Sequence, residues 1–164
     1  MTKLAMPKID RKLISKKIDV IADLKKIVKS ENILDHEDQT RPFETDALSA
    51  YKQKPLAVIF PENTKEVSKI LTYCNHARIK VVPRGAGTGL SGGALPLEDS
   101  ILLCLTKFNK IINIDYKNRC VVAQPGVTNL SITQAVEDMG FYYAPDPSSQ
   151  IACSIGGNVA ENSG

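Results

Sequence analysis

The segment that most limits how this chain can fold is a glycine-rich stretch between residues 83 and 96. Half of the chain's glycines fall within nine of these residues, at Gly85, Gly87, Gly89, Gly92 and Gly93. Without a Cβ atom, glycine can adopt positive φ, so that successive backbone N–H groups can converge on an anion. Glycine clusters also form mobile loops, but here Arg84 begins the stretch and apolar runs flank it. We therefore expect a loop that binds a diphosphate.

Two common nucleotide-binding patterns fit this stretch poorly. Residues 87–92 match the pattern G-x-G-x-x-G, but a Rossmann site also needs a helix at the third glycine and an acidic residue about twenty positions later. Pro96 would break such a helix, and the residue twenty positions after Gly92 is Ile112. The chain also lacks G-x-x-x-x-G-K-[ST]. The sequence thus argues against a Rossmann NAD site and excludes a nucleotide-hydrolysing P-loop.

Apolar runs and helical periodicity place this loop in a mixed α+β fold. The predicted elements are strands at 56–60, 80–83 and 101–105, a helix at about 64–77, a hairpin of strands at 111–115 and 120–124, and a helix at about 128–140. Asn63 and Glu66 have the spacing of a capping box, and Thr128 is the expected N-cap of the last helix. In the hairpin turn, Asn118 is expected to adopt the left-handed conformation.

The first fifty residues are interpreted as a helical extension and a connection, followed by the main domain at 51–164. A helix is predicted at 11–30 because apolar residues recur every three or four positions, at Ile14, Ile18, Ile21, Leu24 and Val28. Residues 1–29 carry nine Lys or Arg and three Asp, so this helix is basic. Such a helix can contact an anionic membrane surface, although a solvated face over a packed stripe is the simpler interpretation. Residues 31–55 are read as an ordered connection.

Composition narrows the remaining classes of function. No apolar run approaches the ~18 residues of a membrane span, and no secretory signal is recognised, so a cytoplasmic location is expected. The four cysteines show no C-x-x-C spacing, and a Cys74–His76 pair is a poor zinc site, so no metal centre is predicted. Reduced, mostly buried thiols fit a reducing compartment. No Arg-rich or aromatic-interleaved patch supports nucleic-acid binding.

The residues of the glycine-rich stretch resemble the FAD pyrophosphate loop of the vanillyl-alcohol-oxidase-type flavoproteins, also called the PCMH-type FAD-binding family. Three later segments agree in the same order, namely 124–127 (QPGV), 143–149 (YAPDPSS) and 154–164 (SIGGNVAENSG). With 45–51 and 55–61, they are most similar to the glycolate oxidase large subunits and D-lactate dehydrogenases of that family. The resemblance covers nearly everything after residue 40. It implies a PCMH-type FAD-binding fold that is incomplete in this chain.

The resemblance also implies which residues contact FAD. They are Pro83, Arg84, Gly85, Ala86, Gly87, Thr88, Gly89, Leu90, Ser91, Gly92, Gly93, Pro125, Gly126, Val127, Asp146, Pro147, Ser148, Ser149, Ser154, Ile155, Gly156, Gly157 and Asn158. Physical reasoning supports the last segment independently, because Ser154 can cap a helix whose first amides, at residues 155–157, would face an anion. Helix–strand packing is the alternative role of Gly156 and Gly157. An Asx turn is the alternative role of Asp146.

Two departures from the family pattern matter. Relatives that attach FAD covalently carry a histidine after this loop, where this chain has Thr88, so non-covalent FAD is implied. The only histidines, His36 and His76, lie outside the matching segments. In the family, the substrate cap and the catalytic or metal-binding histidines come later, so the catalytic residues are expected beyond Gly164.

The resemblance implies the FAD-binding part of an oxidoreductase that oxidises a 2-hydroxy acid, of the glycolate or D-lactate type, by hydride transfer to flavin. The alternatives are a same-fold flavoenzyme acting on another alcohol and a non-catalytic FAD-binding fragment. The implied partners are a small 2-hydroxy acid and electron-transfer subunits.

Overall fold

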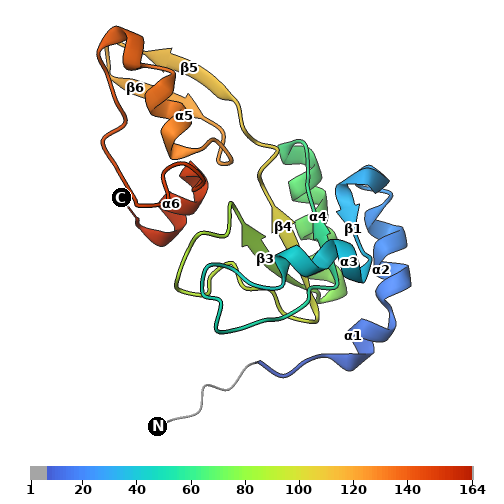
Figure 1. Cartoon of the computed structure of the whole chain (residues 1–164). Helices are drawn as coiled ribbons and strands as arrows, with labels where there is room; N and C mark the ends of the chain where they lie inside the picture. Colours follow the sequence, from blue (N-terminus) through green and yellow to red (C-terminus); the bar gives the residue numbers. More distant parts are fainter. Residues whose placement is uncertain (1–6, 164) are drawn as a thin grey trace.

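A computed structural model of the chain describes residues 7–163 (Figure 1). A four-stranded sheet has the order β1-β2-β4-β3, and β5 and β6 form a separate hairpin. In the larger sheet, β2 (Ala57–Ile59), β4 (Ser100–Cys104) and β3 (Lys80–Arg84) run parallel, and β1 (Ile33–Leu34) pairs antiparallel with β2. Helices and strands are mixed along the chain, as predicted for the α+β class.

The connection from β2 to β3 is α4 (Thr64–Ala77), and its start confirms the predicted cap. The Asn63 side chain accepts a hydrogen bond from the backbone N–H of Glu66 over 3.0 Å. The Glu66 carboxylate in turn accepts from the backbone N–H of Glu62 over 2.7 Å and from the Asn63 side chain over 2.9 Å. The first of these bonds satisfies an N–H group that the first helical turn leaves unpaired. Ile70 and Cys74 point from α4 into the core.

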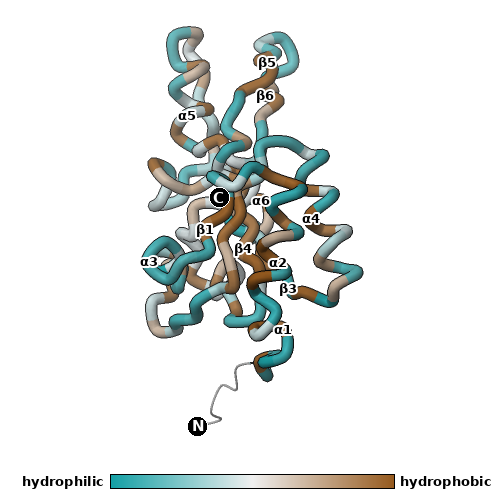
Figure 2. Tube along the Cα trace, turned by 90° about the vertical axis from the view of Figure 1, so that its right-hand side faces the viewer, coloured by the Kyte–Doolittle hydropathy of each residue, from teal (hydrophilic) through white to brown (hydrophobic). Residues whose placement is uncertain are grey.

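The core of this lobe lies between the sheet and the helices that cover it. Strands β2 and β4 are buried along their whole length, because both lie inside the sheet with layers on each face. Val20 and Leu24 of α2 (Lys17–Leu24) join the same cluster as Ile59 and Ile101. The apolar run of β4 lies in the middle of the lobe in Figure 2, between polar outer segments.

The predicted single helix at 11–30 is wrong in its extent. The chain forms α1 (Arg11–Ser15) and α2, which are separated at Lys16 with φ −95° and ψ 12°. This break changes which side chains face inward: Ile18 is 83% exposed, and Val20 is buried instead. The predicted apolar stripe is therefore correct at Ile21, Leu24 and Val28 but wrong at Ile18.

Residues 31–55 are ordered, as expected, and contain more structure than the sequence indicated. They include most of η1 (Ser30–Asn32), the strand β1, α3 (Glu37–Thr40) and η2 (Arg41–Phe43). Because α2 and β1 share a core with β2, the segment from Val20 to Ile33 packs closely on the sheet. The division into an extension at 1–50 and an FAD-binding portion at 51–164 stays a prediction.

A second lobe contains the hairpin of β5 (Ile111–Asp115) and β6 (Cys120–Ala123), together with α5 (Asn129–Gln134), η3 (Glu137–Met139) and α6 (Ile155–Glu161). Thr128 caps α5, as predicted, and accepts from the N–H of Ser131 over 3.2 Å. The predicted helix at 128–140 is divided into α5 and η3, and Gly140 ends it with φ 76°. In the hairpin turn the left-handed residue is Arg119, with φ 55°.

The expectation for Asn118 is wrong because a neighbouring carboxylate holds that residue. Asp115 accepts from the Asn118 backbone N–H over 3.0 Å and from its side-chain amide over 2.7 Å. These two bonds also lower the pKa of Asp115. The backbone therefore turns one residue later, at Arg119.

Backbone hydrogen bonds hold the segment between β6 and α5 against neighbouring parts of the chain. Gly126 donates to Phe108 O over 2.7 Å, which fixes the chain where it leaves β6. Ile155 and Gly156 donate to Val127 O and Pro125 O, each over 2.8 Å, so α6 begins beside that segment. In Figure 1, α6 consequently lies close to the end of β3, where the glycine-rich loop begins. Within residues 7–163, no helix is long and apolar enough to cross a membrane.

Candidate functional site

A cleft of about 730 Å³ lies between the glycine-rich loop and the second lobe. The loop after β3 forms one wall, and the segment before α6, together with α6 itself, forms the opposite wall. The lining residues are Pro83, Arg84, Gly85, Ala86, Gly87, Thr88, Gly89, Leu90, Ser91, Gly93, Ala94, Leu105, Pro125, Pro147, Ser148, Ser149, Cys153, Ser154, Gly156, Gly157, Asn158, Ala160, Glu161 and Ser163. The structure thus brings together sequence segments that lie about sixty residues apart.

Most residues of the glycine-rich loop line this cleft, and their backbone donors are free of protein partners within residues 7–163. Within the described part of the chain, no backbone N–H of residues 85–94 donates a hydrogen bond to another protein group. Unpaired amides are costly when they are sheltered from water, and a row of them in a turn conformation forms an anion-binding concavity. These amides lie in a half-exposed loop and are therefore available to an anionic ligand.

A segment from the N-terminal connection holds the loop in place. The Arg84 guanidinium donates to Thr45 O over 2.7 Å and lies over the Phe43 ring, 5.7 Å from its centroid. The backbone N–H of Ala47 donates to Gly87 O over 2.9 Å. We call residues 43–48 the strap. The strap thus pairs with one loop carbonyl and with the Arg84 guanidinium, and it leaves the loop amides free.

Two positions in the loop require glycine for different reasons. Gly87 has φ 74°, and a Cβ atom there would lie 2.5 Å from Cζ of Arg84. Gly85 does not have a positive φ, but a Cβ atom on this residue would overlap the Ser154 hydroxyl on the opposite wall of the cleft. The loop thus approaches α6 more closely than any residue with a side chain would allow.

Two buried polar groups on the opposite wall lack partners. Ser154 is 4% exposed and Asn158 is 6% exposed, yet neither the Ser154 hydroxyl nor the Asn158 side-chain amide nitrogen has a hydrogen-bond partner among the described residues. Buried polar groups are nearly always paired in folded proteins, so unpaired groups beside a cleft indicate ligand contacts. Both residues line this cleft.

The prediction about the start of α6 is correct in position and partly wrong in chemistry. Ser154 is the N-cap residue, but its side chain makes no capping hydrogen bond. The amides of Ile155 and Gly156 are used by the carbonyls of Val127 and Pro125 and so cannot face an anion. Of the three backbone amides expected to face an anion, only that of Gly157 has no carbonyl partner outside the helix among the described residues.

Most of the predicted cofactor-contacting residues line the cleft. The exceptions are Gly92, Gly126, Val127, Asp146 and Ile155. Gly126 packs on the main chain instead, where a Cβ atom would lie 2.8 Å from Phe108 O, and Val127 is buried in the core. Ile155 lines a different cavity. The role of each predicted residue in binding FAD stays a prediction.

The structure adds lining residues that sequence reasoning missed, namely Ala94, Leu105, Cys153, Ala160, Glu161 and Ser163. A signal existed for Glu161, which follows Gly157 by four positions and so lies on the same helical face. Leu105 and Cys153 could not be found in this way, because only the packing of the two lobes brings them to the cleft.

Thiols and histidines in this region have no evident catalytic role. Burial raises the pKa of the Cys104 thiol to about 12, although the charge of Arg84 opposes the shift, so this thiol stays protonated. His36 and His76 are exposed and do not line the cleft. Among the described residues, no group of three or more His, Cys, Asp or Glu could hold a metal ion.

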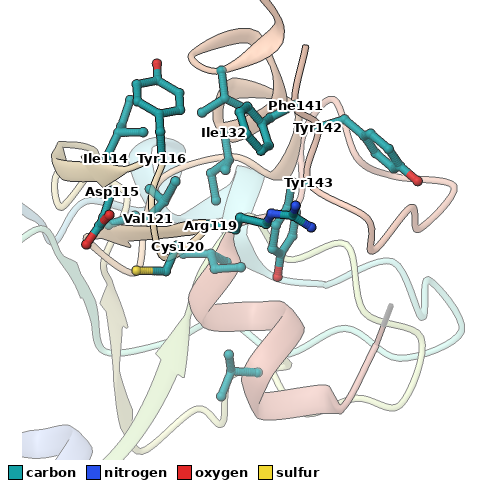
Figure 3. A pocket seen from close by; sticks show the side chains of 14 residues that line it. Ile114, Asp115, Tyr116, Arg119, Cys120, Val121, Ile132, Phe141, Tyr142 and Tyr143 are labelled. Carbon is teal, nitrogen blue, oxygen red and sulfur yellow. The ribbon is translucent and has the colours of Figure 1, made fainter. Parts of the chain in front are cut away.

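A second cavity of about 590 Å³ lies inside the second lobe (Figure 3). Apolar side chains such as Ile114, Val121 and Ile132 line it, and the Tyr116 and Phe141 rings pack with centroids 5.7 Å apart. It has neither the glycine-rich loop nor the unpaired amides of the cleft. The cleft is therefore the better candidate for an anion site.

Comparison with known families identifies the ligand class. Residues 55–164 match the family model described as "FAD binding domain", which covers more than half of the chain. The chain belongs to this family. The matched region contains both walls of the cleft, and FAD carries the diphosphate that a row of loop amides can bind.

Relatives and solved structures agree with this assignment. The chain is 50% identical over 160 residues to glycolate oxidase subunit GlcD of Escherichia coli strain K12. The aligned region covers 98% of this chain and 31% of that protein. It is 43% identical over 146 residues to GlcD of Bacillus subtilis strain 168, covering 89% of this chain and 31% of that protein. The chain thus spans about a third of the length of these curated relatives.

The fold agrees with that of a solved p-cresol methylhydroxylase. That structure has a TM-score of 0.77 and 20% sequence identity, and the match covers 94% of this chain and 30% of that one. This likeness confirms the expected PCMH-type FAD-binding fold. Because the match covers only part of the larger protein, the fold is incomplete here.

Proposed function

We propose that this chain is the FAD-binding part of an oxidoreductase that oxidises a 2-hydroxy acid, of the glycolate or D-lactate type, to a 2-oxo acid. The observation that carries the cofactor assignment is the row of unpaired amides at residues 85–94 in a cleft with two unpaired buried polar groups. The substrate class is supported by the identity to the glycolate oxidase subunits.

The residues of the cleft fit FAD in this proposal. The amides of residues 85–93 would hold the diphosphate, and the hydroxyls of Ser148 and Ser149 would add donors from the facing wall. The Ser154 hydroxyl and the Asn158 amide nitrogen would find the partners that they lack within the protein. Bound FAD supplies the two-electron redox chemistry of the intact enzyme, and this chain positions it.

Non-covalent attachment is part of the proposal. Thr88 occupies the loop position where covalently linked relatives carry histidine, and no histidine lines the cleft. Threonine has no nucleophilic ring nitrogen to form such a bond. The predicted binding therefore relies on amides, hydroxyls and close packing.

The rest of the chemistry is assigned to a longer protein. The hairpin exposes Ile112 and Val122 on its outer face, and α6 exposes Val159. In an intact enzyme we expect other parts of the protein to cover these side chains and to supply the groups that bind a carboxylate and remove a hydroxyl proton. The names of the relatives describe a subunit, so we also propose electron-transfer subunits as partners. A cytoplasmic location fits four unpaired cysteines.

A second candidate is oxidation of another alcohol on the same fold. It is supported by one observation, the likeness to a solved 4-ethylphenol oxidase of Gulosibacter chungangensis, which has a TM-score of 0.75 and 26% sequence identity over 94% of this chain and 30% of that one. Higher identity to the glycolate oxidase subunits makes the 2-hydroxy acid the leading candidate.

The proposal is tested in two steps. Titrating the 164-residue chain with FAD should quench flavin fluorescence saturably, whereas riboflavin, which lacks the diphosphate, should bind far more weakly. Equal binding of both would refute the assignment of the loop. A protein extended to the length of the relatives should then reduce an electron-acceptor dye with glycolate or D-lactate and not with a phenolic alcohol. The chain alone should not turn over either acid.

A further inference from the structure

Glu161, the last residue of α6, reaches across the cleft to the glycine-rich loop. The Ser91 hydroxyl donates a hydrogen bond to its carboxylate. The other carboxylate oxygen lies 2.5 Å from the position that a Cβ atom on Gly93 would take, and Cδ lies 3.8 Å from the equivalent position on Gly89. The carboxylate therefore lies directly against residues 89–93.

This contact places a negative charge at the row of unpaired amides. The backbone N–H groups of residues 89–93 belong to that row, which is the part of the cleft suited to a diphosphate. Among the described residues, no Lys, Arg or His forms an ion pair with Glu161, and its hydrogen-bond donor is the neutral hydroxyl of Ser91. Within the described part of the chain, the negative charge of Glu161 is thus not paired with a cation.

We propose that Glu161 gates the cleft by competing with the diphosphate for the glycine-rich loop. In the closed arrangement, the carboxylate bridges α6 and Ser91 across the cleft. A diphosphate that binds the free amides beside Glu161 brings a second anion within a few ångströms of its carboxylate, so the Glu161–Ser91 contact must open. The inference rests on the proposed function, because it assumes that the ligand of the loop is FAD.

Competition and simple structural bridging make opposite predictions. If Glu161 only holds the loop in its binding shape, removing its charge weakens FAD binding. If it competes, removing the charge strengthens FAD binding. Glutamine has nearly the same shape and can still pair with the Ser91 hydroxyl, so Glu161→Gln isolates the charge.

The experiment compares the FAD affinity of the wild-type chain with that of Glu161→Gln. Repulsion between exposed charges a few ångströms apart corresponds to about a three- to tenfold change in affinity, so we expect Glu161→Gln to bind FAD about three- to tenfold more tightly at low salt. Salt screens this repulsion, and the difference should shrink towards zero at about 0.5 M salt. The matched control is Glu137→Gln, which removes one exposed acidic charge from η3, outside the cleft, and should leave the affinity unchanged.

Three outcomes decide between the hypotheses. Tighter binding by Glu161→Gln alone, with the expected salt dependence, supports gating. Unchanged or weaker binding by a Glu161→Gln protein with a wild-type urea midpoint overturns gating and leaves the FAD assignment intact. Failure of both wild type and Glu161→Gln to bind FAD at all refutes the proposed function, and the gating inference with it.

Discussion

Replacing Gly87 with valine should abolish FAD binding while leaving the sheet and α4 folded. Gly87 has φ 74°, a region that side chains with a branched Cβ rarely adopt. Holding such a residue there costs about 1–3 kcal/mol. This first contribution depends only on the backbone and would arise at any glycine with the same φ.

A second contribution depends on the surroundings of Gly87. The new Cβ would lie 2.5 Å from Cζ of Arg84 and 2.6 Å from its Nε, so the guanidinium must move. Its hydrogen bond to Thr45 O and its position over the Phe43 ring would then be lost. A hydrogen bond from a charged donor contributes about 1.5–3 kcal/mol, and water can replace part of it at this half-buried site. Together we expect the free energy of unfolding to fall by about 2–4 kcal/mol.

The effect on FAD should be larger than the effect on folding. The valine side chain fills space beside the unpaired amides, and the displaced Arg84 releases the loop from the strap. Saturable quenching of flavin fluorescence should therefore disappear. Urea unfolding followed by circular dichroism measures the stability of the same protein samples.

Gly140 provides a matched control for the backbone strain. It has φ 76°, and an added Cβ would meet nothing within 4 Å. Gly140→Val should therefore lose only about 1–3 kcal/mol of stability and bind FAD normally. A folded Gly87→Val protein with wild-type FAD affinity would refute our account of the loop. Equal loss of affinity in both variants would show that strain alone is responsible.

Three further predictions concern acid stability, thiols and cofactor attachment. Hydrogen bonds from Asn32, Lys29 and Lys107 lower the pKa of Glu62 to about 2. Because this pKa is lower in the folded state, ionised Glu62 stabilises the fold above pH 4.5, and this contribution is lost as the pH falls towards 2. The urea midpoint of the wild-type chain should therefore decrease over that range. It should decrease less in Glu62→Gln, which has no carboxylate to protonate. An unchanged pH profile in that variant would contradict the assignment. Exposed Cys120 should react rapidly with a thiol reagent. Burial raises the pKa of the Cys74 thiol to about 11, so Cys74 should react only after unfolding. Equal reaction rates of the two thiols in the folded protein would contradict the burial of Cys74. Acid precipitation of FAD-loaded protein should leave all flavin in the supernatant, and flavin fluorescence in the washed pellet would disprove non-covalent binding.

The elements that could be predicted from the sequence are those fixed by short-range interactions. The caps at Asn63 and Thr128 depend on atoms three residues apart, and the buried strands β2 and β4 depend on continuous apolar runs. The turn of the β5–β6 hairpin was predicted wrongly because a side-chain hydrogen bond there outweighs the backbone preference of asparagine. Asp115 captures Asn118 and moves the left-handed residue to Arg119.

The break at Lys16 could not be read from periodicity. Apolar residues at steps of three and four fit one continuous helix and two offset helices almost equally well. Tertiary packing chooses between them, because Val20 and Ile21 are buried on the sheet while Ile18 faces solvent. The two-residue strand β1 was missed for a related reason. It is too short to show alternation and exists because β2 offers an edge to pair with.

For the candidate site, the sequence indicated the glycine-rich wall and most of the opposite wall but not what supports them. The strap at residues 43–48 contacts the loop through main-chain atoms, of Thr45 and of Ala47, and main-chain contacts leave little trace in residue type. Gly126 shows the opposite problem. Its place in a cofactor-like segment predicts a ligand contact, and the structure gives it a further role that the segment did not indicate, close packing against Phe108 O.

The positions of the loop glycines show why a glycine-rich pattern alone does not identify a ligand. A Cβ atom on Gly85 would overlap the Ser154 side chain, and one on Gly93 would meet the Glu161 carboxylate, so the close approach of α6 favours small residues at both positions without any ligand. What these contacts leave unexplained are the unpaired amides of residues 85–94 and the unpaired groups of Ser154 and Asn158. Since those groups converge on one cleft from both walls, a single bound molecule with anionic and hydrogen-bonding groups can satisfy all of them. The evidence for FAD in this structure therefore lies in the unsatisfied donors, and the glycines are the means by which α6 is brought close enough to complete the site.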